Sequence, residues 1–398
     1  MTDACSSFVS LCMIVRNEAH SLAECLQSAR GAVDEMLVVD TGSSDGTALV
    51  ANRLGARVVS FAWTEDFAAA RNASLAHARG NWILVLDADE RLTGNAGARL
   101  RKLLPGPTDV VAYLLQQRTP TPSSAGTGMV RTEWLPRLFR TGVGARYTGA
   151  VHECILPSLA GKGRVVHADL VIQHDGYLRS PEDVRAKALR NLRILQRELE
   201  RDPADALAWI QVGDCHACLQ DADAAIAAYR AGLGLLERPS ARGHQTVDPA
   251  TAAMAWQQFA AALLLRGQVT EAVPALERAL RLWPTLAPAR MLLGQARARS
   301  GDWTQAIEDY RQAIETAAGP APPGQPVHFD PWLAWYLKGA AEARLGRDEE
   351  AERSLSEAIR LNPASADAHR LLGLLRQLRD AAATTRAPQG PAAGGGRG

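Results

Sequence analysis

The pattern of apolar and polar residues changes near residue 175. Before that point, short continuous apolar runs alternate with segments whose apolar residues recur at helical spacing. The apolar runs are residues 7–15, 35–40, 56–61 and 82–87. Strands and helices in alternation predict a largely parallel sheet covered by helices, and binding sites in such sheets gather at the carboxyl ends of the strands.

After residue 180 the chain is rich in Ala and Leu and its pattern is helical throughout. Ser180 and Pro181 predict a helix start, because a hydroxyl cap, an early proline and the acids of the next two residues favour one. Further on, a small residue is followed twelve positions later by Ala and four positions after that by an aromatic residue or Leu. The four sets are Gly213, Ala225 and Tyr229; Ala260, Ala272 and Leu276; Gly294, Ala306 and Tyr310; and Gly339, Ala351 and Leu355.

The spacing between these sets resembles the tetratricopeptide repeat, whose two helices need small residues where they touch. From Ala260 to Gly294, and from Gly339 to Gly373, the step is 34 residues, which is the length of one unit. The other two steps are longer, and Pro/Gly-rich segments at 238–250 and 319–331 hold the surplus as enlarged loops. We therefore expect about four and a half repeat units that form a helical solenoid.

These patterns divide the chain into four parts. We expect an α/β domain over residues 1–178, a linking helix over 179–202, the repeats over 203–378 and a disordered tail over 379–398.

Composition excludes several classes of protein. With 398 residues, 22% charged and 47% hydrophobic, the chain reads as a soluble globular protein of two domains, and its formal net charge of +1 argues against nucleic-acid binding. No apolar run is long enough to predict a membrane span. The six scattered cysteines fit free thiols in a reducing compartment, so we expect a cytoplasmic protein.

Polar clusters follow the predicted strands. Arg16, Asn17 and Glu18 end the first, Asp40 ends the second, and Asp87 and Asp89 end the fourth. The glycine-rich turn after Asp40 lacks the lysine of a phosphate loop, and a carboxylate there suits hydrogen bonds from a base or ribose better than contact with a phosphate.

The motifs in this region identify a family. "MIVRNE", "VVDTGSSDGT" and "AAARNASLAHARGNWILVLDADERL" resemble, in order and spacing, the family 2 glycosyltransferases of the GT-A fold. The later "WLPRLFRTGVGARYTGAVHE" and "LVIQHDGY" resemble a subgroup that often carries tetratricopeptide repeats, including sugar transferases of envelope biosynthesis and sublancin-type peptide S-glycosyltransferases. The resemblance implies an α/β GT-A domain followed by an all-α repeat solenoid.

The resemblance also implies site residues. Asp87 and Asp89 match the D-x-D motif, which holds Mn²⁺ or Mg²⁺ against the diphosphate of a nucleotide sugar, and His174 is a further candidate metal ligand. The residues expected at the nucleotide sugar are Arg16, Asn17, Glu18, Asp40, Gly42, Ser43, Arg71, Asn72, Asp87 and Ala88. Several of them have an alternative interpretation: Asp87 and Asp89 as a solvated strand end, Glu18 and Asp40 as caps, Arg71 as a partner of Glu65 or Asp66, and His174 as a structural histidine.

The family inverts the anomeric centre by direct displacement, which requires a base for the acceptor. Glu153 is the expected base and Glu90 the reserve. Arg137 and Arg140, expected on one face of a strand, either contact the diphosphate or acceptor or lie on a solvated face.

These features favour a transferase that moves one sugar, because the Q-x-x-R-W signature of processive synthases is absent. We expect a nucleotide sugar as the donor, and among nucleotide sugars we favour a UDP-sugar. We expect a protein, a peptide or a cell-envelope glycan as the acceptor. The repeats are expected to recruit the acceptor or a partner protein, and they also allow a homo-oligomer. The alternatives are a repeat scaffold with a degenerate transferase domain and a nucleotidyltransferase, although the latter's lysine-containing loop is not visible.

Overall fold

A computed structural model describes residues 7–121, 129–175, 180–237, 247–317 and 329–386. The chain separates into two compact units, and the division falls between residues 262 and 263, inside helix α9. The first unit therefore holds more than the α/β region, since the helices that directly follow it belong to the same unit. None of the described helices is long and apolar enough to cross a bilayer.

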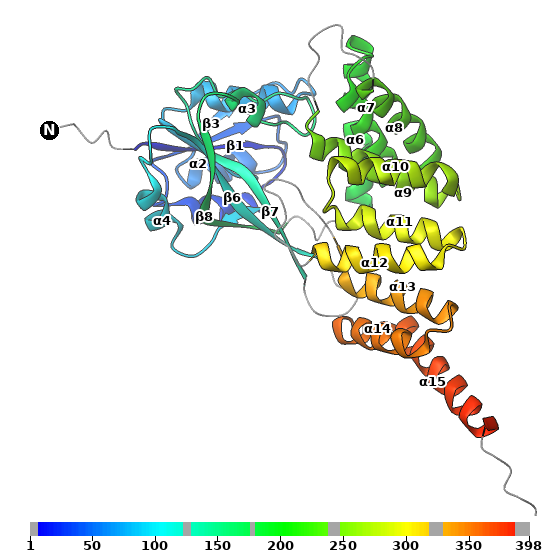
Figure 1. The fold of residues 1–398 in the computed structure, drawn as a ribbon. Helices are drawn as coiled ribbons and strands as arrows, with labels where there is room; N and C mark the ends of the chain where they lie inside the picture. Colours follow the sequence, from blue (N-terminus) through cyan, green and yellow to red (C-terminus); the bar gives the residue numbers. More distant parts are fainter. Residues whose placement is uncertain (1–6, 122–128, 176–179, 238–246, 318–328, 387–398) are drawn as a thin grey trace, which may run out of the picture. The chain divides into compact units, whose positions relative to one another are not determined.

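One eight-stranded sheet organises the first unit, with strand order β3-β2-β1-β4-β7-β6-β8-β5 (Figure 1). The four early strands are parallel to one another, as their continuous apolar runs predict. They span Val9–Val15 (β1), Glu35–Asp40 (β2), Arg57–Ser60 (β3) and Trp82–Val85 (β4). These bounds confirm the strands predicted at 7–15, 35–40, 56–61 and 82–87.

The other half of the sheet is mixed, so the prediction of a largely parallel sheet holds for only one half. β7 is antiparallel to β4 and β6, β8 is parallel to β6, and β5 is antiparallel to β8. Antiparallel neighbours need no crossover helix between them. These strands span Glu90–Leu92 (β5), Val110–Thr121 (β6), Met129–Arg140 (β7) and Arg164–His174 (β8).

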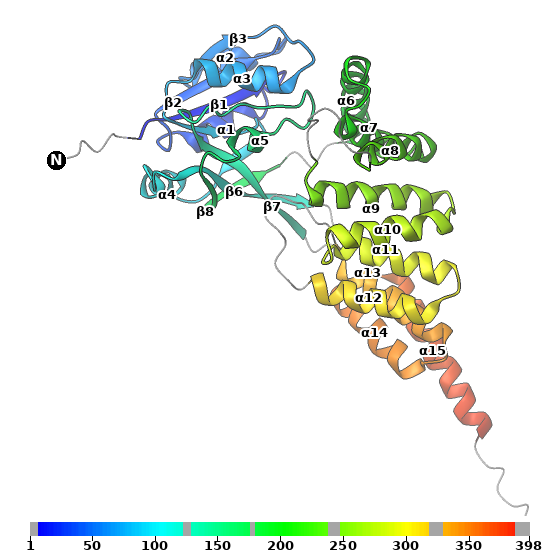
Figure 2. The ribbon, with the colours of Figure 1, turned by 45° about the horizontal axis from the view of Figure 1, so that its top comes forward.

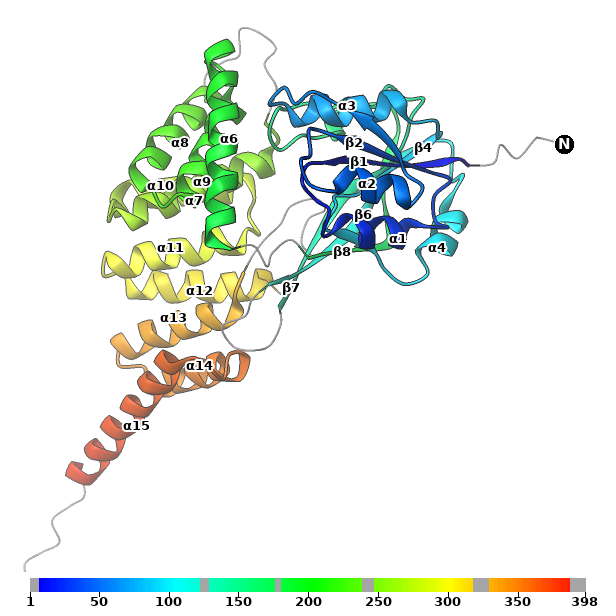
Figure 3. The ribbon, with the colours of Figure 1, turned by 180° about the vertical axis from the view of Figure 1, so that it is seen from behind.

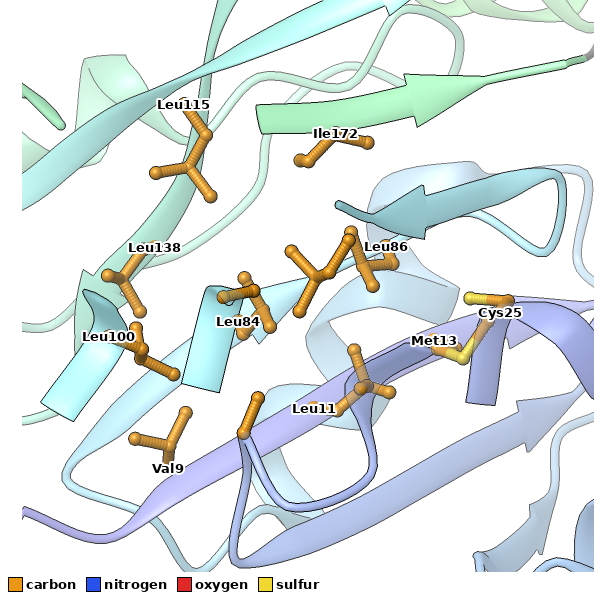
Figure 4. Packing of buried hydrophobic residues seen from close by; sticks show 14 of the residues in the cluster. Val9, Leu11, Met13, Cys25, Leu84, Leu86, Leu100, Leu115, Leu138 and Ile172 are labelled. Atoms are coloured by element: carbon orange, nitrogen blue, oxygen red, sulfur yellow. The ribbon is translucent and has the colours of Figure 1, made fainter. Parts of the chain in front are cut away.

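Helices cover both faces of the sheet (Figure 3). Leu11 and Met13 of β1 face α1 and α4, whereas Cys12, between them, faces α3, because successive side chains of a strand alternate between faces. Figure 4 shows Leu11, Met13 and Leu84 gathered with Cys25 of α1 and Leu100 of α4. These helices are Leu22–Ala29 (α1), Thr47–Arg53 (α2), Phe67–His77 (α3), Ala96–Leu103 (α4) and Leu156–Leu159 (α5).

The helix predicted after residue 180 is present as α6 (Pro181–Arg201). Ser180 caps it, and Ser180 and Asp183 exchange hydrogen bonds in a capping box. Buried residues of α6 pack with Ala150 and Val151 of the α/β region and with the next two helices, Ala206–Cys218 (α7) and Ala222–Leu236 (α8). The segment expected only to link two domains is therefore part of the first unit's core.

The predicted contacts between repeat helices are confirmed in both units. A Cβ on Gly213 of α7 would lie 2.6 Å from the ring of Tyr229 on α8, and one on Gly294 of α11 would lie 2.6 Å from the ring of Tyr310 on α12. Within the second unit α11 to α14 stack in order (Figures 1 and 2). The remaining helices are Pro249–Leu265 (α9), Val269–Leu282 (α10), Ala287–Arg299 (α11), Trp303–Ala317 (α12), Pro331–Arg344 (α13), Asp348–Leu361 (α14) and Ala366–Arg386 (α15).

The predicted tail begins too early. Residues 379–386 are helical as the end of α15, so the helix outlasts the repeat pattern by two turns. The tail beyond residue 386 and most of the two enlarged loops lie outside the described residues.

Candidate functional site

The loops after β1 and β2 hold each other in place. Asn17 has a positive φ of 57°; its backbone N–H donates to the Ser43 hydroxyl at 3.0 Å, and its side-chain oxygen accepts from the Ser44 N–H at 2.8 Å. The Glu18 N–H donates to Thr47 at 2.8 Å. These bonds bring the two predicted nucleotide-binding loops together at the carboxyl end of the sheet.

Asp40 closes the turn that follows β2. One carboxylate oxygen accepts from the N–H groups of Gly42 at 3.0 Å and Ser43 at 2.8 Å. Gly42 has a φ of 103°, a conformation that glycine adopts without strain. Asp40 thus caps this turn, which was the alternative interpretation of the residue. Among the described residues, its second carboxylate oxygen has no hydrogen-bond donor.

Arg71 on α3 is the centre of the site. Its side chain is only 7% exposed, and it donates from Nε to Glu153 at 3.0 Å and from Nη2 to Asp87 at 2.5 Å. Its third nitrogen, Nη1, is buried and makes no hydrogen bond. The guanidinium lies over the Tyr147 ring, 5.9 Å from its centroid. The predicted alternative, a pair with Glu65 or Asp66, is wrong: Glu65 pairs with Arg193 and Arg197 of α6, and Asp66 caps α3.

Asp87 is held by two arginines. Arg137 of β7 donates to its second oxygen at 2.9 Å, opposite Arg71. Burial alone raises a carboxyl pKa, but the charges of Arg71 and Arg137 outweigh it and hold the pKa of Asp87 well below its usual range. Each oxygen of Asp87 accepts a hydrogen bond from an arginine, and the side chain is still 37% exposed, so a ligand can reach it.

Glu90, the reserve base, is fully buried. It accepts from the Asp87 N–H at 2.8 Å, from Arg137 at 2.5 Å and from Gln117. Burial raises the pKa of Glu90 to about 7. A carboxyl with no exposed surface and three donors cannot reach an acceptor, so this geometry gives Glu90 the role of positioning Asp87 and Arg137.

The segment that carries Glu153 is a loop. It is pinned by a bridge between Thr148 and Cys154 and by His152 at a φ of 54°. Asn72 of α3 holds the start of this segment, because its amide exchanges two 2.9 Å hydrogen bonds with the backbone of Tyr147. The predicted donor contact Asn72 therefore acts on the loop that presents Glu153.

Asp89 and His174 lie together at the edge of the sheet, where β5 pairs with β8. The His174 Nε2 is 3.4 Å from an Asp89 oxygen, and its Nδ1 is 3.1 Å from the Thr119 hydroxyl. Burial acts to lower the pKa of His174, but Asp89 raises it overall. A carboxylate beside an imidazole whose other nitrogen is fixed suits a divalent cation. Among the described residues no group of three or more His, Cys, Asp or Glu is arranged around a metal position. Of the three predicted ligands, Asp89 and His174 thus lie side by side, whereas Asp87 forms ion pairs with Arg71 and Arg137.

Within the part of the chain that the structure describes, two predicted donor residues make no polar side-chain contact. Arg16 is exposed just after β1, and the side chain of Ala88 is buried in the core. Ala88 can therefore meet a ligand only through its backbone.

A cavity of about 690 Å³ opens beside Asp89. Glu18 and Ala88 line it, as do Lys187 and Arg190 of α6. The cavity thus lies between Glu18, a predicted nucleotide contact, and Asp89, a predicted metal ligand.

Sequence reasoning understated Arg137 and missed Gln117 and Thr119. The signal for Arg137 was present, because an arginine in the apolar run "WLPRLF" is expected to be buried and therefore paired. Arg137 and Arg140 do not share one face, since three positions along a strand reverse the side; Arg140 instead donates to the carbonyls of Val110, Pro105 and Pro107.

Comparison with known proteins agrees with this geometry. Residues 10–155 match the model of the glycosyl transferase family 2, and residues 251–324 and 333–365 match tetratricopeptide repeat models. A TPR repeat-containing protein of Synechococcus elongatus is 38% identical over 212 residues, which are 52% of this chain and 51% of that protein. The glycosyltransferase SunS of Bacillus subtilis is 24% identical over 194 residues, which are 48% of this chain and 45% of SunS. The chain thus spans about half the length of these relatives.

Solved structures resemble the helical part. The match to MamA covers 48% of this chain and 98% of the MamA chain, with 21% sequence identity and a TM-score of 0.37. The match to YrrB, a TPR protein with an unusual peptide-binding site, covers 47% of this chain and 84% of the YrrB chain, with 20% sequence identity and a TM-score of 0.38. At scores this low the likeness says nothing about partners. The matched residues and the fold together show that the N-terminal domain of this chain is a family 2 glycosyltransferase domain of the GT-A fold, and that tetratricopeptide repeats follow it.

Proposed function

We propose that this protein is a metal-dependent, inverting glycosyltransferase that moves one sugar from a nucleotide sugar to a protein or peptide acceptor. Among nucleotide sugars we favour a UDP-sugar, and the repeats recruit the acceptor. One observation carries the proposal: Arg71 binds both Glu153 and Asp87. This single side chain brings the expected base, which lies far along the sequence, to the end of the strand that precedes the expected metal position.

Each part of the site has a role in the transfer. The loops of Asn17 and Asp40 hold the nucleoside, and the loop after β4 lies beside its diphosphate. Asp89 and His174 hold the cation. When bound, Mn²⁺ or Mg²⁺ supplies positive charge to the departing diphosphate. Asp87, held between Arg71 and Arg137, fixes the two guanidinium groups that face the reaction.

Glu153 takes the proton from the acceptor nucleophile. The nucleophile then forms a bond to the anomeric carbon as the bond from that carbon to the diphosphate oxygen breaks, and the electron pair leaves with the nucleoside diphosphate. Attack opposite to the departing group inverts the anomeric centre. Arg71 orients Glu153 through Nε and has a buried N–H at Nη1 to offer the ligand.

The donor half of the proposal is tested by melting the full chain with UDP, GDP, CDP and ADP, each with Mn²⁺ or with chelator. A ligand that binds only the folded state at about 100 times its Kd stabilises the protein by about 2.7 kcal/mol. We expect stabilisation that requires Mn²⁺ with UDP. No shift with any of the four nucleotides would favour the scaffold with a degenerate transferase domain.

The catalytic half is tested by Glu153→Gln, which keeps the shape of the side chain and removes the base. We expect turnover of the donor to fall by a factor of about 10² to 10⁴, with donor binding kept. The matched control is Asp169→Asn, a carboxylate on β8 whose side chain is 87% exposed. Equal turnover in both variants would exclude Glu153 as the base and direct the search to another group.

A protein or peptide acceptor is distinguished from an envelope glycan by incubating the enzyme and labelled donor with a cell extract. Label that becomes protease-sensitive supports the proposal. If the label resists protease and partitions with glycan or lipid, the acceptor is a glycan or lipid rather than a protein. The proposed transferase activity would then stand with a different acceptor.

A further inference from the structure

The cavity beside Asp89 has two walls that come from distant parts of the sequence. Glu18, Ala88 and Asp89 line it from the strand ends of the sheet, and Asp183, Lys187 and Arg190 line it from α6. The helix that follows the strands therefore faces the same space as the expected donor-binding residues.

Helix α6 is held firmly in this position. Leu192 and Leu195 pack with Ala150 and Val151, which directly precede the His152–Glu153 pair. On the other side, Glu65 forms ion pairs with Arg193 and Arg197 of α6. The helix is thus anchored to the segment that carries the proposed base.

The charges in the cavity explain what these first turns could do. The carboxylates of Glu18, Glu24, Asp89, Asp175 and Asp183 line the cavity, so a diphosphate there is repelled unless cations compensate. Arg91, which forms ion pairs with Glu24 and Asp175, lines the cavity as well. Lys187 and Arg190 are the basic residues that α6 adds.

Each of these two residues also acts on a neighbouring element. Burial and the positive charge of Lys187 lower the pKa of His152, the residue before Glu153. The guanidinium of Arg190 lies over the ring of Phe67, 5.0 Å from its centroid, at the start of the helix that carries Arg71. Lys187 and Arg190 are three positions apart in the sequence, so their side chains share one face of α6.

We propose that Lys187 and Arg190 bind the diphosphate of the nucleotide sugar, so that α6 completes the donor site of the transferase domain. This inference rests on the proposed function and extends it, because it assigns the phosphate contacts to a helix outside the residues 10–155 that match the family. Lysine and arginine form charge-assisted hydrogen bonds with phosphate oxygens, and these bonds grow in importance as the diphosphate gains charge on leaving.

The test compares UDP with UMP, each titrated calorimetrically into the full chain with Mn²⁺. Lys187→Ala should weaken UDP binding about tenfold, as loss of one charge-assisted bond at an exposed position implies, and should change UMP binding by less than about twofold. Lys187→Arg should recover most of the UDP affinity. The matched control is Arg185→Ala, an exposed basic residue of α6 two positions away and therefore off the cavity face, which should change neither.

The outcomes separate the two proposals. If the wild-type chain binds none of UDP, GDP, CDP and ADP, the proposed function itself fails; if it binds one of the other three in place of UDP, that diphosphate and its monophosphate replace UDP and UMP in the comparison. If the wild type binds UDP and Lys187→Ala binds it equally well, the inference about α6 is wrong and the proposed function stands. If Lys187→Ala weakens UDP and UMP to the same extent, Lys187 does not act through the second phosphate, and the inference is also overturned.

Discussion

The Arg71 ion pairs allow a quantitative prediction. Arg71→Met keeps the length of the side chain but removes its charge, so Glu153 loses its arginine while Asp87 keeps only Arg137. Because Arg71 is 7% exposed and Glu153 16% exposed, water cannot replace the lost bonds fully. We therefore expect a large loss of stability rather than the small loss seen when a surface pair is broken.

The magnitude follows mainly from the burial of Arg71 and Glu153, because the side chain of Asp87 is 37% exposed and water can replace part of its lost bond. Removing one partner of a buried ion pair costs roughly 3–5 kcal/mol, and the remaining bond from Arg137 to Asp87 favours the lower end, about 3 kcal/mol. At about 2–4 °C per kcal/mol, the melting temperature of the first unit should fall by roughly 6–12 °C. The assay is thermal unfolding of the full chain, followed by circular dichroism, with no ligand present.

The chain offers a matched control. Arg79 is 72% exposed and lies 3.8 Å from Glu35, so Arg79→Met should cost no more than about 0.5 kcal/mol. A double-mutant cycle of Arg71→Met with Glu153→Gln should give a coupling of about 1 kcal/mol or more. The reasoning is refuted if Arg71→Met is no more destabilising than Arg79→Met, or if the coupling is near zero.

Three further predictions concern the metal, the repeat packing and pH. Asp89→Ala should leave the protein folded but abolish the part of UDP affinity that depends on Mn²⁺; an unchanged Mn²⁺ dependence in calorimetry would remove Asp89 from the metal site. Gly213→Ala should cost about 1–3 kcal/mol in denaturant unfolding, because its methyl group would meet the Tyr229 ring at 2.6 Å. Gly234→Ala, where the same methyl meets nothing within 4 Å, should stabilise α8 by up to about 1 kcal/mol, and equal effects at the two glycines would contradict this packing. Burial raises the pKa of the Asp214 carboxyl in the folded protein from 3.8 to about 6. Between pH 3.8 and pH 6 the folded protein therefore binds a proton that the unfolded chain has lost, and its stability falls as the pH rises through this range. Asp214→Asn should therefore gain more in melting temperature at pH 8 than at pH 4, and a gain independent of pH would show that this carboxyl is not perturbed.

The parts of the fold that depend on local pattern could be predicted from the sequence. The four parallel strands are continuous apolar runs, and the small residues at Gly213 and Gly294 mark where an aromatic ring from the next helix must fit. The mixed half of the sheet could not be predicted in this way, because β5 has only three residues and its pairing with β8 joins segments about eighty positions apart. Local periodicity carries no information about such a pairing.

The site shows the same division. The Asp87 and Asp89 motif could be read from the sequence, but the different environments of the two carboxylates could not, since Arg71, Arg137 and His174 come from three separate elements. The wall supplied by α6 was not predicted either, because neither helical spacing nor charge identifies which face of a helix borders a cavity.

The central claim is that this chain transfers a sugar with inversion, with Glu153 as the base. The most direct measurement follows the full chain with UDP-α-glucose, UDP-α-galactose and UDP-α-N-acetylglucosamine, each with Mn²⁺ and water as the acceptor, by proton NMR. We predict that one of these donors is consumed, that the first sugar released is the β-anomer, and that Glu153→Gln stops its release while UDP still binds. Release of the α-anomer first, or equal release by the Glu153→Gln variant, would contradict the claim.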